Sequence, residues 1–358
     1  MAPKSNYDLV GLYITDDFID VVCGVDVRTT GTGTSQAPNI DIPSGRDRFF
    51  FNEGIEPAFR QVAAWIFTHA RHVKTIGIGC YGPFTSLNHD LRRDDPGYGL
   101  LQPSKRGLLC GSNVRTLLMD ALDVRMAPDI IVETDVNVAA LGHLYTLPPT
   151  KGRPAASWSD EVVVFLKISH GIGGGVVFGS KIWAGQLHPE MGHIQVRAWD
   201  GDRRWRPAVP STCAHHAGCL QGVANIAALE KRWSLPFDTL LQHPDHDAWR
   251  REAYFLAQLC VSVTALLAPS RIIIGGRMMK MTMLVDLIRH EFRSMLADQD
   301  GRFHPTYPSI EQPDYIQTVG IDPDGQPRRP GVIGALCLAA LMSRHDARVS
   351  ALLPRTYH

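Results

Sequence analysis

The stretch "DIIVETDVNVAALGHLY" (Asp129–Tyr145) combines the two features on which the fold prediction depends. "DIIVETD" is rich in β-branched residues and predicts a buried strand, and "VNVAALGHLY" predicts a helix that begins directly after it. Asp135 stands at the junction, in the crevice at the carboxyl end of a strand, where α/β proteins bind ligands. Its carboxylate is a candidate general base for a substrate hydroxyl, or alternatively the N-cap of the helix.

Strands and helices alternate in the same way along the rest of the chain, which predicts an α/β fold with a mixed sheet, in two lobes. Strands are expected in 8–26 (a hairpin), 73–82, 129–135, 161–182 (a second hairpin) and 271–276. Helices are expected in 56–72, 113–123, 136–145, 220–233, 246–269, 281–298 and 331–344.

Composition excludes several classes of protein. Lys+Arg and Asp+Glu both number 36 in 358 residues, so there is no basic face for nucleic acid. No apolar run reaches the ~18 residues that a membrane span requires, and no secretion signal is recognisable, so we expect a cytoplasmic protein without a membrane partner. The 7 cysteines are scattered, which does not suggest a disulfide framework.

A cysteine–histidine cluster occurs in "STCAHHAGC" (Ser211–Cys219). Cys213, His216 and Cys219 provide three ligands of the kind that Zn²⁺ prefers, and His193 upstream is a candidate for the fourth. His215 is an alternative third ligand. We expect a structural zinc ion that fixes a loop; the simpler alternative is a loop with two free thiols and a surface histidine.

A glycine-rich segment, "SHGIGGGVV" (Ser169–Val177), lies between two predicted strands. Its glycines can turn successive N–H groups inward to form a nest for phosphate oxygens, although ordinary turn chemistry explains them equally well. They are Gly171, Gly173, Gly174 and Gly175. The pair Gly275–Gly276 after "RIII" is a weaker signal of the same kind.

Taken together and in this order, the motifs resemble those of the ROK family of sugar kinases, and most closely its zinc-containing bacterial fructokinase branch. "TDVNVAALG" resembles the segment with the catalytic aspartate, "SHGIGGGVV" the second phosphate loop and "HPEMGHI" the Glu-x-Gly-His signature. "CAHHAGCLQG" resembles the zinc loop, "RIIIGGRMM" the turn beside the adenosine and "GVIGALCLAAL" the closing helix.

The resemblance implies a two-lobed actin-like, ribonuclease-H-like sugar kinase fold with a small structural zinc loop. The N-terminal lobe would comprise residues 1–118 together with a closing helix over 331–346, and the C-terminal lobe residues 119–330. The reaction would be ATP-dependent phosphorylation of a fructose-like hexose, with Mg-ATP as donor, in a protein that forms a homodimer.

The resemblance also implies a role for each matching residue. Asp135 would be the general base. The sugar side would be lined by Asn137, Glu190 and His193, with Gln221 where the family usually has a glutamate. ATP phosphates would face Gly171, Gly173 and Gly174, and the adenosine Gly275 and Gly276. Zinc would be held by His193, Cys213, His216 and Cys219.

The first hairpin, "YITDDFIDVVCGV" (Tyr13–Val25), departs from the family pattern. The family's Gly-Gly-Thr-Lys loop aligns with Asp17, Phe18, Ile19 and Asp20. Phe18 and Ile19 would bring bulk, and an anion at Asp20 would repel phosphate by ~1 kcal/mol or more. Asp17 or Asp20 could instead hold Mg²⁺, or the hairpin could simply carry a solvated turn at Asp16 and Asp17.

Three functions therefore remain open for a small polar or sugar-like substrate. The first is a hexose kinase. The second is an enzyme without ATP, a lyase, isomerase or cyclase that uses Asp135, Glu190 or His193 for proton transfer. The third is a non-catalytic pseudokinase or sugar sensor.

Overall fold

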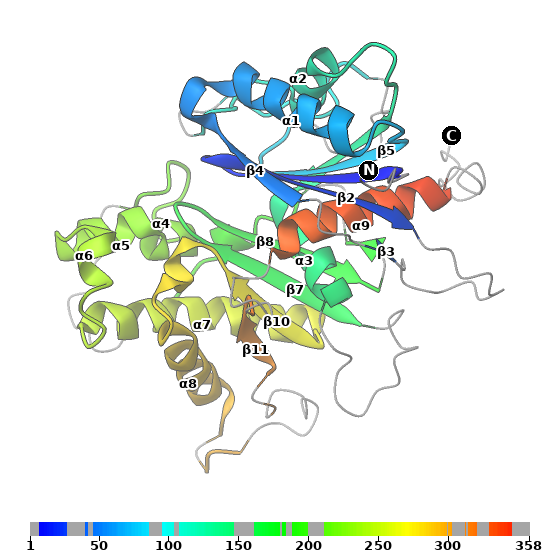
Figure 1. Ribbon diagram of the computed structural model, residues 1–358. Helices are drawn as coiled ribbons and strands as arrows, with labels where there is room; N and C mark the ends of the chain where they lie inside the picture. The colour runs from blue at the N-terminus through cyan, green and yellow to red at the C-terminus, as the bar shows by residue number, and fades with distance from the viewer. Residues whose placement is uncertain are drawn as a thin grey trace, which may run out of the picture. The chain divides into compact units, whose positions relative to one another are not determined.

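The protein was analysed as a computed structural model. It describes residues 7–26, 40–41, 46–85, 95–103, 107–146, 161–179, 181–183, 188–199, 211–298, 300–302, 312, 314–320 and 329–345. The chain divides into two compact units (Figure 1). Unit 1 contains Met1–Ser159, Gly179–His188 and Arg329–His358, and unit 2 contains Asp160–Phe178 and Pro189–Arg328. Each unit has a mixed sheet with helices, which confirms the predicted α/β class.

The sheet of unit 1 has the order β3-β2-β1-β5-β6, with β4 also paired to β2. β1, β5 and the last strand, β6, are parallel, and β2 runs antiparallel to both β1 and β4. Ile14, Cys80 and Thr134 are register partners at the ends of β1, β5 and β6, so the three strands end at one edge, here called the carboxyl edge. The bounds are β1 Leu9–Ile14, β2 Phe18–Asp26, β3 Ile40–Asp41, β4 Arg46–Phe50, β5 Thr75–Cys80 and β6 Asp129–Thr134.

Helices cover both faces of this sheet (Figure 1). On one face α1 (Ile55–His69) and α2 (Val114–Ala121) bury alternate strand residues such as Leu12 and Ile19. On the other face α9 (Pro330–His345) lies directly against β1 and β5. A Cβ on Gly77 would overlap the carbonyl oxygen of Ala335, so only glycine permits this close approach. α3 (Asp135–Thr146) packs in turn against α9.

The grouping of residues 119–159 follows from strand pairing. The sequence-based boundary after residue 118 falls ahead of β6, whereas the structure groups β6 and α3 with unit 1. The reason is that β6 extends the sheet beside β5 and α3 packs on α9. The described part of the expected closing helix, α9, also belongs to unit 1.

The sheet of unit 2 has the order β11-β10-β7-β8-β9. β7 and β8 form the predicted second hairpin, and β10 runs parallel to β7 and β11. The strand bounds are β7 Val162–Ile168, β8 Ile172–Phe178, β9 Lys181–Ile182, β10 Arg271–Gly275 and β11 Ile316–Thr318. Because β7 and β10 are parallel, the turn after β7 and the end of β10 lie at the same edge.

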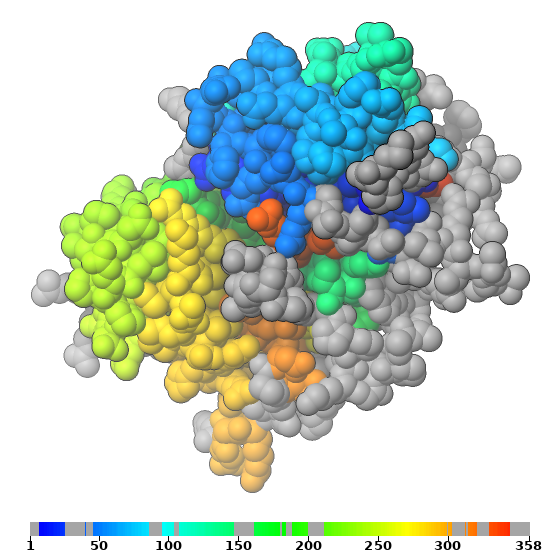
Figure 2. All heavy atoms as spheres, in the orientation of Figure 1, coloured from blue at the N-terminus to red at the C-terminus, as the bar shows by residue number. Residues whose placement is uncertain are grey.

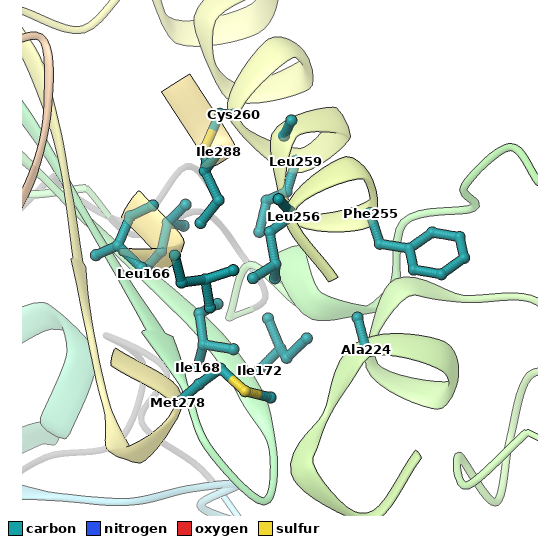
Figure 3. Close-up of a cluster of buried hydrophobic side chains, with 14 of the residues drawn as sticks. Leu166, Ile168, Ile172, Ala224, Phe255, Leu256, Leu259, Cys260, Met278 and Ile288 are labelled. Atoms are coloured by element: carbon teal, nitrogen blue, oxygen red, sulfur yellow. The ribbon is translucent and has the colours of Figure 1, made fainter. Parts of the chain in front are cut away.

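One face of this sheet is buried under helices. Figure 3 shows Leu166 and Ile168 of β7 facing Leu256 and Leu259 of α7 across the core. The helix bounds are α4 Leu220–Ala224, α5 Ile226–Trp233, α6 Phe237–Leu240, α7 Asp247–Leu267 and α8 Leu284–Leu296. Short 3₁₀ turns lie at η1 Phe51–Glu53, η3 Met191–His193 and η4 Arg277–Lys280.

The helix predicted over 220–233 is divided into α4 and α5 at Asn225. The Asn225 side chain accepts a hydrogen bond from the backbone N–H of Ala228 and donates one to the carbonyl of His170. Asparagine competes with the helix backbone in this way, and it therefore caps α5 while it interrupts the longer helix.

β4 pairs only with β2 among the described strands, and exposed charged residues, Arg46 and Asp47, begin it. Charges of this kind discourage pairing with other chains at a sheet edge. Figure 2 shows the atoms of β4 and α1, in blue, at the surface in this view. No helix in the described part of the chain is long and apolar enough to cross a membrane.

Candidate functional site

Asp135 lies at the carboxyl edge of unit 1 as the first residue of α3. The Oγ1 of Thr134 accepts from the backbone N–H of Asn137 at 3.4 Å, so Thr134, and not Asp135, occupies the N-cap position. The Oδ1 of Asp135 accepts from the N–H of Val136 at 2.9 Å, and the residue is 5% exposed. A negative charge is favoured at a helix N-terminus, which suits a carboxylate that accepts a proton.

Asn137 points toward Glu133, a residue that the sequence analysis did not single out. Its Nδ2 donates to Oε1 of Glu133 at 3.0 Å, and Asn137 is only 2% exposed. This geometry favours a role for Asn137 in positioning Glu133 over direct contact with a substrate. Within a helix, the i, i+4 spacing of Glu133 and Asn137 would indicate a side-chain contact. Here Glu133 lies in β6 and Asn137 in α3, so the spacing alone could not predict the contact.

The turn of the first hairpin is closed by its own threonine. The Oγ1 of Thr15 accepts from the backbone N–H groups of Asp17 and Phe18 at 3.2 and 3.1 Å. Asp16 and Asp17 are exposed. The turn thus carries two acidic side chains at the carboxyl edge, and two of its N–H groups already have an acceptor.

Two expectations about this hairpin are wrong. Ile19 is fully buried in the core beneath α1, so it brings no bulk to the turn. Asp20 does not present a bare negative charge, because Arg48 donates to both of its carboxylate oxygens at 2.6 and 2.9 Å and Arg329 lies 3.5 Å away. The same contacts make Asp20 a poor ligand for Mg²⁺.

The glycine-rich segment of unit 2 differs from the predicted nest. Only Gly171 lies in the turn, whereas Gly173, Gly174 and Gly175 belong to β8 and pair with β7. At Gly174 a Cβ would overlap the sulfur of Met191, so close packing explains that glycine. A phosphate nest is therefore limited to the Ser169–Gly171 turn.

Two side chains hold that turn in place. The Oε1 of Gln221 accepts from the N–H of Ile172 at 3.0 Å, and Asn225 holds the carbonyl of His170 at 2.9 Å. Gln221 thus contacts the turn with the oxygen of its amide. The motif resemblance implied a sugar contact for Gln221, and no motif pointed to Asn225.

Gly275 and Gly276 lie at the end of β10, at the same edge of the unit 2 sheet as this turn. Gly276 has φ +97°, and a Cβ there would overlap the carbonyl of Ile168. Backbone geometry and close packing against Ile168 therefore require this glycine at the position assigned to the adenosine.

The predicted metal ligands come together in unit 2. One ligand atom from each of His193, Cys213, His216 and Cys219 lies within 4.8 Å of the other three. The Nδ1 of His193 lies 3.6 Å from Sγ of Cys213, 3.5 Å from Sγ of Cys219 and 3.2 Å from Nδ1 of His216. His215 contacts the cluster through its backbone N–H, which donates to Cys213.

These separations fit a tetrahedral zinc ion. Bond lengths of about 2.3 Å to sulfur and 2.0–2.1 Å to nitrogen require S···N separations of about 3.6 Å and N···N separations of about 3.3 Å. Burial lowers the pKa of His193, which keeps its imidazole neutral and able to bind metal, and burial raises the pKa of the Cys219 thiol. Metal binding would therefore release protons from the cysteines.

Glu190 lies beside the cluster. Its Oε2 is 3.8 Å from Nε2 of His193, the ring nitrogen opposite the one that faces the cysteines. Carboxylates in this position orient metal-bound histidines. The arrangement therefore connects Glu190, an exposed side chain, to the cluster through His193.

With this geometry established, comparison with known proteins gives the family. The ROK family model matches residues 52–319, and the chain belongs to the ROK family. The resemblance drawn from the motifs is thereby confirmed. The matched range begins after the first hairpin and ends before α9.

Curated relatives include fructokinases. The fructokinase of Lactococcus lactis subsp. cremoris is 30% identical over 226 residues, which cover 63% of this chain and 68% of the relative. The fructokinase of Pediococcus pentosaceus is 28% identical over 267 residues, covering 75% and 80%.

Solved structures share the fold. The ROK hexokinase from Thermus thermophilus aligns with a TM-score of 0.60 at 21% identity, covering 94% of this chain and 99% of the other. A ROK family glucokinase from Streptomyces griseus, in complex with glucose and AMPPNP, aligns with a TM-score of 0.56 at 18% identity, covering 93% and 99%. The two-sheet α/β architecture is thus that of ROK sugar kinases.

Proposed function

We propose that the protein is a hexose kinase that transfers the γ-phosphoryl group of Mg-ATP to a fructose-like sugar. The observation that carries this proposal is the place of Asp135, at the start of α3 and at the edge where β1, β5 and β6 end. Membership of the ROK family and the fructokinase relatives support it.

In this reaction Asp135 accepts the proton of the attacking sugar hydroxyl as the new P–O bond forms and ADP leaves with the electrons of the broken bond. Phosphoryl transfer depends mainly on positioning and charge neutralisation, so the base must be held still. The bond from the N–H of Val136 and the Thr134 cap do this. Glu133, held by Asn137, is a further polar group near the base.

Other residues that the motifs assign to the donor and to the sugar belong to unit 2. The Ser169–Gly171 turn is the remaining candidate for a phosphate contact, and Gly275–Gly276 for the adenosine. Glu190 is a candidate sugar contact, oriented through His193. A structural zinc ion held by His193, Cys213, His216 and Cys219 would fix the backbone around Glu190.

A second candidate is favoured by one specific observation. The N–H groups of Asp17 and Phe18 are already bonded to Thr15, and that of Ile172 to Gln221, so three donors near the assigned phosphate positions have protein acceptors. A repurposed enzyme without ATP (a lyase, isomerase or cyclase) or a sugar sensor would need none of them.

The deciding experiment measures ADP release with Mg-ATP and a panel of hexoses. The kinase proposal expects sugar-dependent ADP release, fastest with fructose or a close analogue, and a loss of about 10²–10⁴-fold in kcat for Asp135→Asn. Asp129→Asn, at the opposite end of β6, is the matched control and should retain turnover.

Two outcomes would contradict the proposal. Absence of nucleotide binding at millimolar Mg-ATP, measured by calorimetry with and without sugar, would favour the second candidate. Undiminished turnover by Asp135→Asn would place the base elsewhere. The expected homodimer and cytoplasmic location stay predictions.

A further inference from the structure

A cluster of two arginines around one buried aspartate lies beside the first hairpin. Asp20 of β2 and Arg48 of β4 are register partners, so their side chains leave the same face of the sheet. Arg48 donates from Nε and Nη2 to the two oxygens of Asp20 at 2.6 and 2.9 Å. Arg329, immediately before α9, brings Nη1 to 3.5 Å from the same carboxylate.

The cluster has more positive than negative charge. Two guanidinium groups share one carboxylate, and no other described carboxylate forms an ion pair with either of them. The Asp20 side chain is 4% exposed, whereas those of Arg48 and Arg329 are 32% and 33% exposed. The surplus charge therefore lies on groups that reach solvent, and an anion can contact them without displacing Asp20.

The position of Arg48 is fixed from two sides. Its Cζ lies 3.7 Å from the centre of the Phe18 ring, and Phe18 is the first residue of β2 after the Asp16–Asp17 turn. Because the Arg48 guanidinium stacks on the Phe18 ring and forms a bidentate bond with Asp20, it has little conformational freedom. Binding an anion therefore costs little additional side-chain entropy.

The cluster also lies near the carboxyl edge. Asp20 is the register partner of Tyr13, which precedes Ile14, so it lies close to this edge. In the strand order, β2 is three strand spacings from β6, roughly 14 Å, and β4 is four, roughly 19 Å. Asp135 thus lies at the carboxyl edge of the unit 1 sheet, and the arginine cluster lies near the same edge. The turn between them has two N–H groups bonded to Thr15 and carries the acidic side chains of Asp16 and Asp17, so the attraction for an anion must come from the two arginines.

We propose that Arg48 and Arg329, oriented by Asp20, form a phosphate-binding site that receives a phosphate group of the phosphoryl donor. The identity of the anion as a donor phosphate rests on the proposed kinase function; the binding of a phosphate-type anion does not. In this arrangement Asp20 is a positioning residue, and Arg329 contributes the surplus charge.

The direct test is calorimetric titration of the full chain with inorganic pyrophosphate, without metal or nucleotide. Arg329→Gln removes the surplus charge while it leaves the bidentate Asp20–Arg48 bond, and it should weaken pyrophosphate binding about tenfold. Arg329→Lys should recover part of the loss. Arg125→Gln is the matched control, because Arg125 also pairs with an aspartate in unit 1, and it should bind as the wild type does.

The kinetic readout separates the two proposals. If the protein is a kinase, Arg329→Gln should raise the KM for Mg-ATP with little change in the KM for the hexose. The wild type could lack kinase activity and still bind pyrophosphate more tightly than Arg329→Gln does. This result would refute the proposed kinase function and support the phosphate-binding site. Equal pyrophosphate binding by the wild type and Arg329→Gln, or no binding by the wild type, would refute the site.

Discussion

Asp135 and Asp20 are two aspartates near strand ends of one sheet, and their neighbours give them different roles. Asp135 accepts from the backbone N–H of Val136 at the start of α3. Asp20 is held by Arg48 and approached by Arg329. Sequence analysis identified both residues, but it assigned a repulsive charge to Asp20 because the arginines lie 28 and 309 positions away in the chain.

Glu252 of α7 shows a third environment for a carboxylate. It is buried in unit 2 and accepts from Nη1 of Arg232 at 2.7 Å, while Arg232 also contacts the carbonyl of Val223 at the end of α4. Burial raises the pKa of Glu252 from 4.5 to about 7, because the loss of water outweighs the attraction of Arg232. A carboxyl with a raised pKa stabilises the fold fully below pH 4.5, and this contribution is lost as the pH rises through 7.

We therefore predict that the free energy of unfolding of the wild type, relative to Glu252→Gln, falls between pH 5 and pH 8. A shift from 4.5 to about 7 corresponds to a change of ~3 kcal/mol. Urea titrations at several pH values measure it. Glu56→Gln, in an exposed pair with Arg60, is the control and should show no such trend. A relative stability that rises with pH would mean that Arg232 dominates and depresses the pKa.

The contact between α3 and α9 depends on glycines at the interface. A Cβ on Gly142 of α3 would overlap the carbonyl oxygen of Pro330, the first residue of α9. The two helix backbones are thus in direct contact, and neither helix can move closer. Helix propensity alone would favour alanine over glycine by about 1 kcal/mol, so the two effects oppose each other at this position.

We predict that the cost of the steric overlap exceeds the gain in helix propensity, so that Gly142→Ala lowers the free energy of unfolding by about 1–3 kcal/mol. Gly82→Ala is a suitable comparison, since a Cβ there meets nothing closer than 3.6 Å. Chemical denaturation of both variants decides the question. A Gly142→Ala protein as stable as the wild type would show that α9 can shift away from α3.

Regular elements were well predicted where one short segment determines them. β5, α1, α7 and α8 follow from apolar spacing, because local periodicity reports which face is buried. The break at Asn225 was missed because it depends on a partner, His170, in another segment. Gly173 and Gly174 were placed in a turn because composition does not give the register of β7 with β8.

The candidate site was predictable to the same extent. Asp135 follows from a strand directly before a helix, and Cys213, His216 and Cys219 follow from their short spacing. His193, 20 positions before Cys213, could be named only as a candidate for the fourth ligand. Arg48 and Arg329 had no such signal, since arginines occur throughout the sequence. Arg48 is brought to Asp20 by the pairing of β2 with β4, and Arg329 is brought to it because the chain returns to unit 1 at α9.

At the level of the whole protein, all four metal ligands belong to unit 2, so metal removal should act first on that unit. We predict about one zinc ion per chain and a lower thermal midpoint after chelation. A site filled a thousandfold above its Kd contributes about 4 kcal/mol. Hydrogen exchange should rise in residues 211–233 before it rises in 9–26.

Cys213→Ser should abolish zinc content and reproduce the effect of chelation. Cys110→Ser, which removes a cysteine of unit 1 outside the cluster, should change neither. Freshly purified wild-type protein without zinc would remove the assignment of a structural ion, and the four side chains would then form a metal-free contact.

The late position of α9 affects how the protein is made. The strands β1 and β5 leave the ribosome early, with glycines where a helix backbone must lie, yet that helix is synthesised only after unit 2. At 5–20 residues per second, the interval between β5 and α9 is roughly 13–50 s. Until then the part of the sheet face that packs against α9 is uncovered and Arg329 is missing. We therefore expect this face of the unit 1 sheet to reach its final packing only after unit 2 has been synthesised.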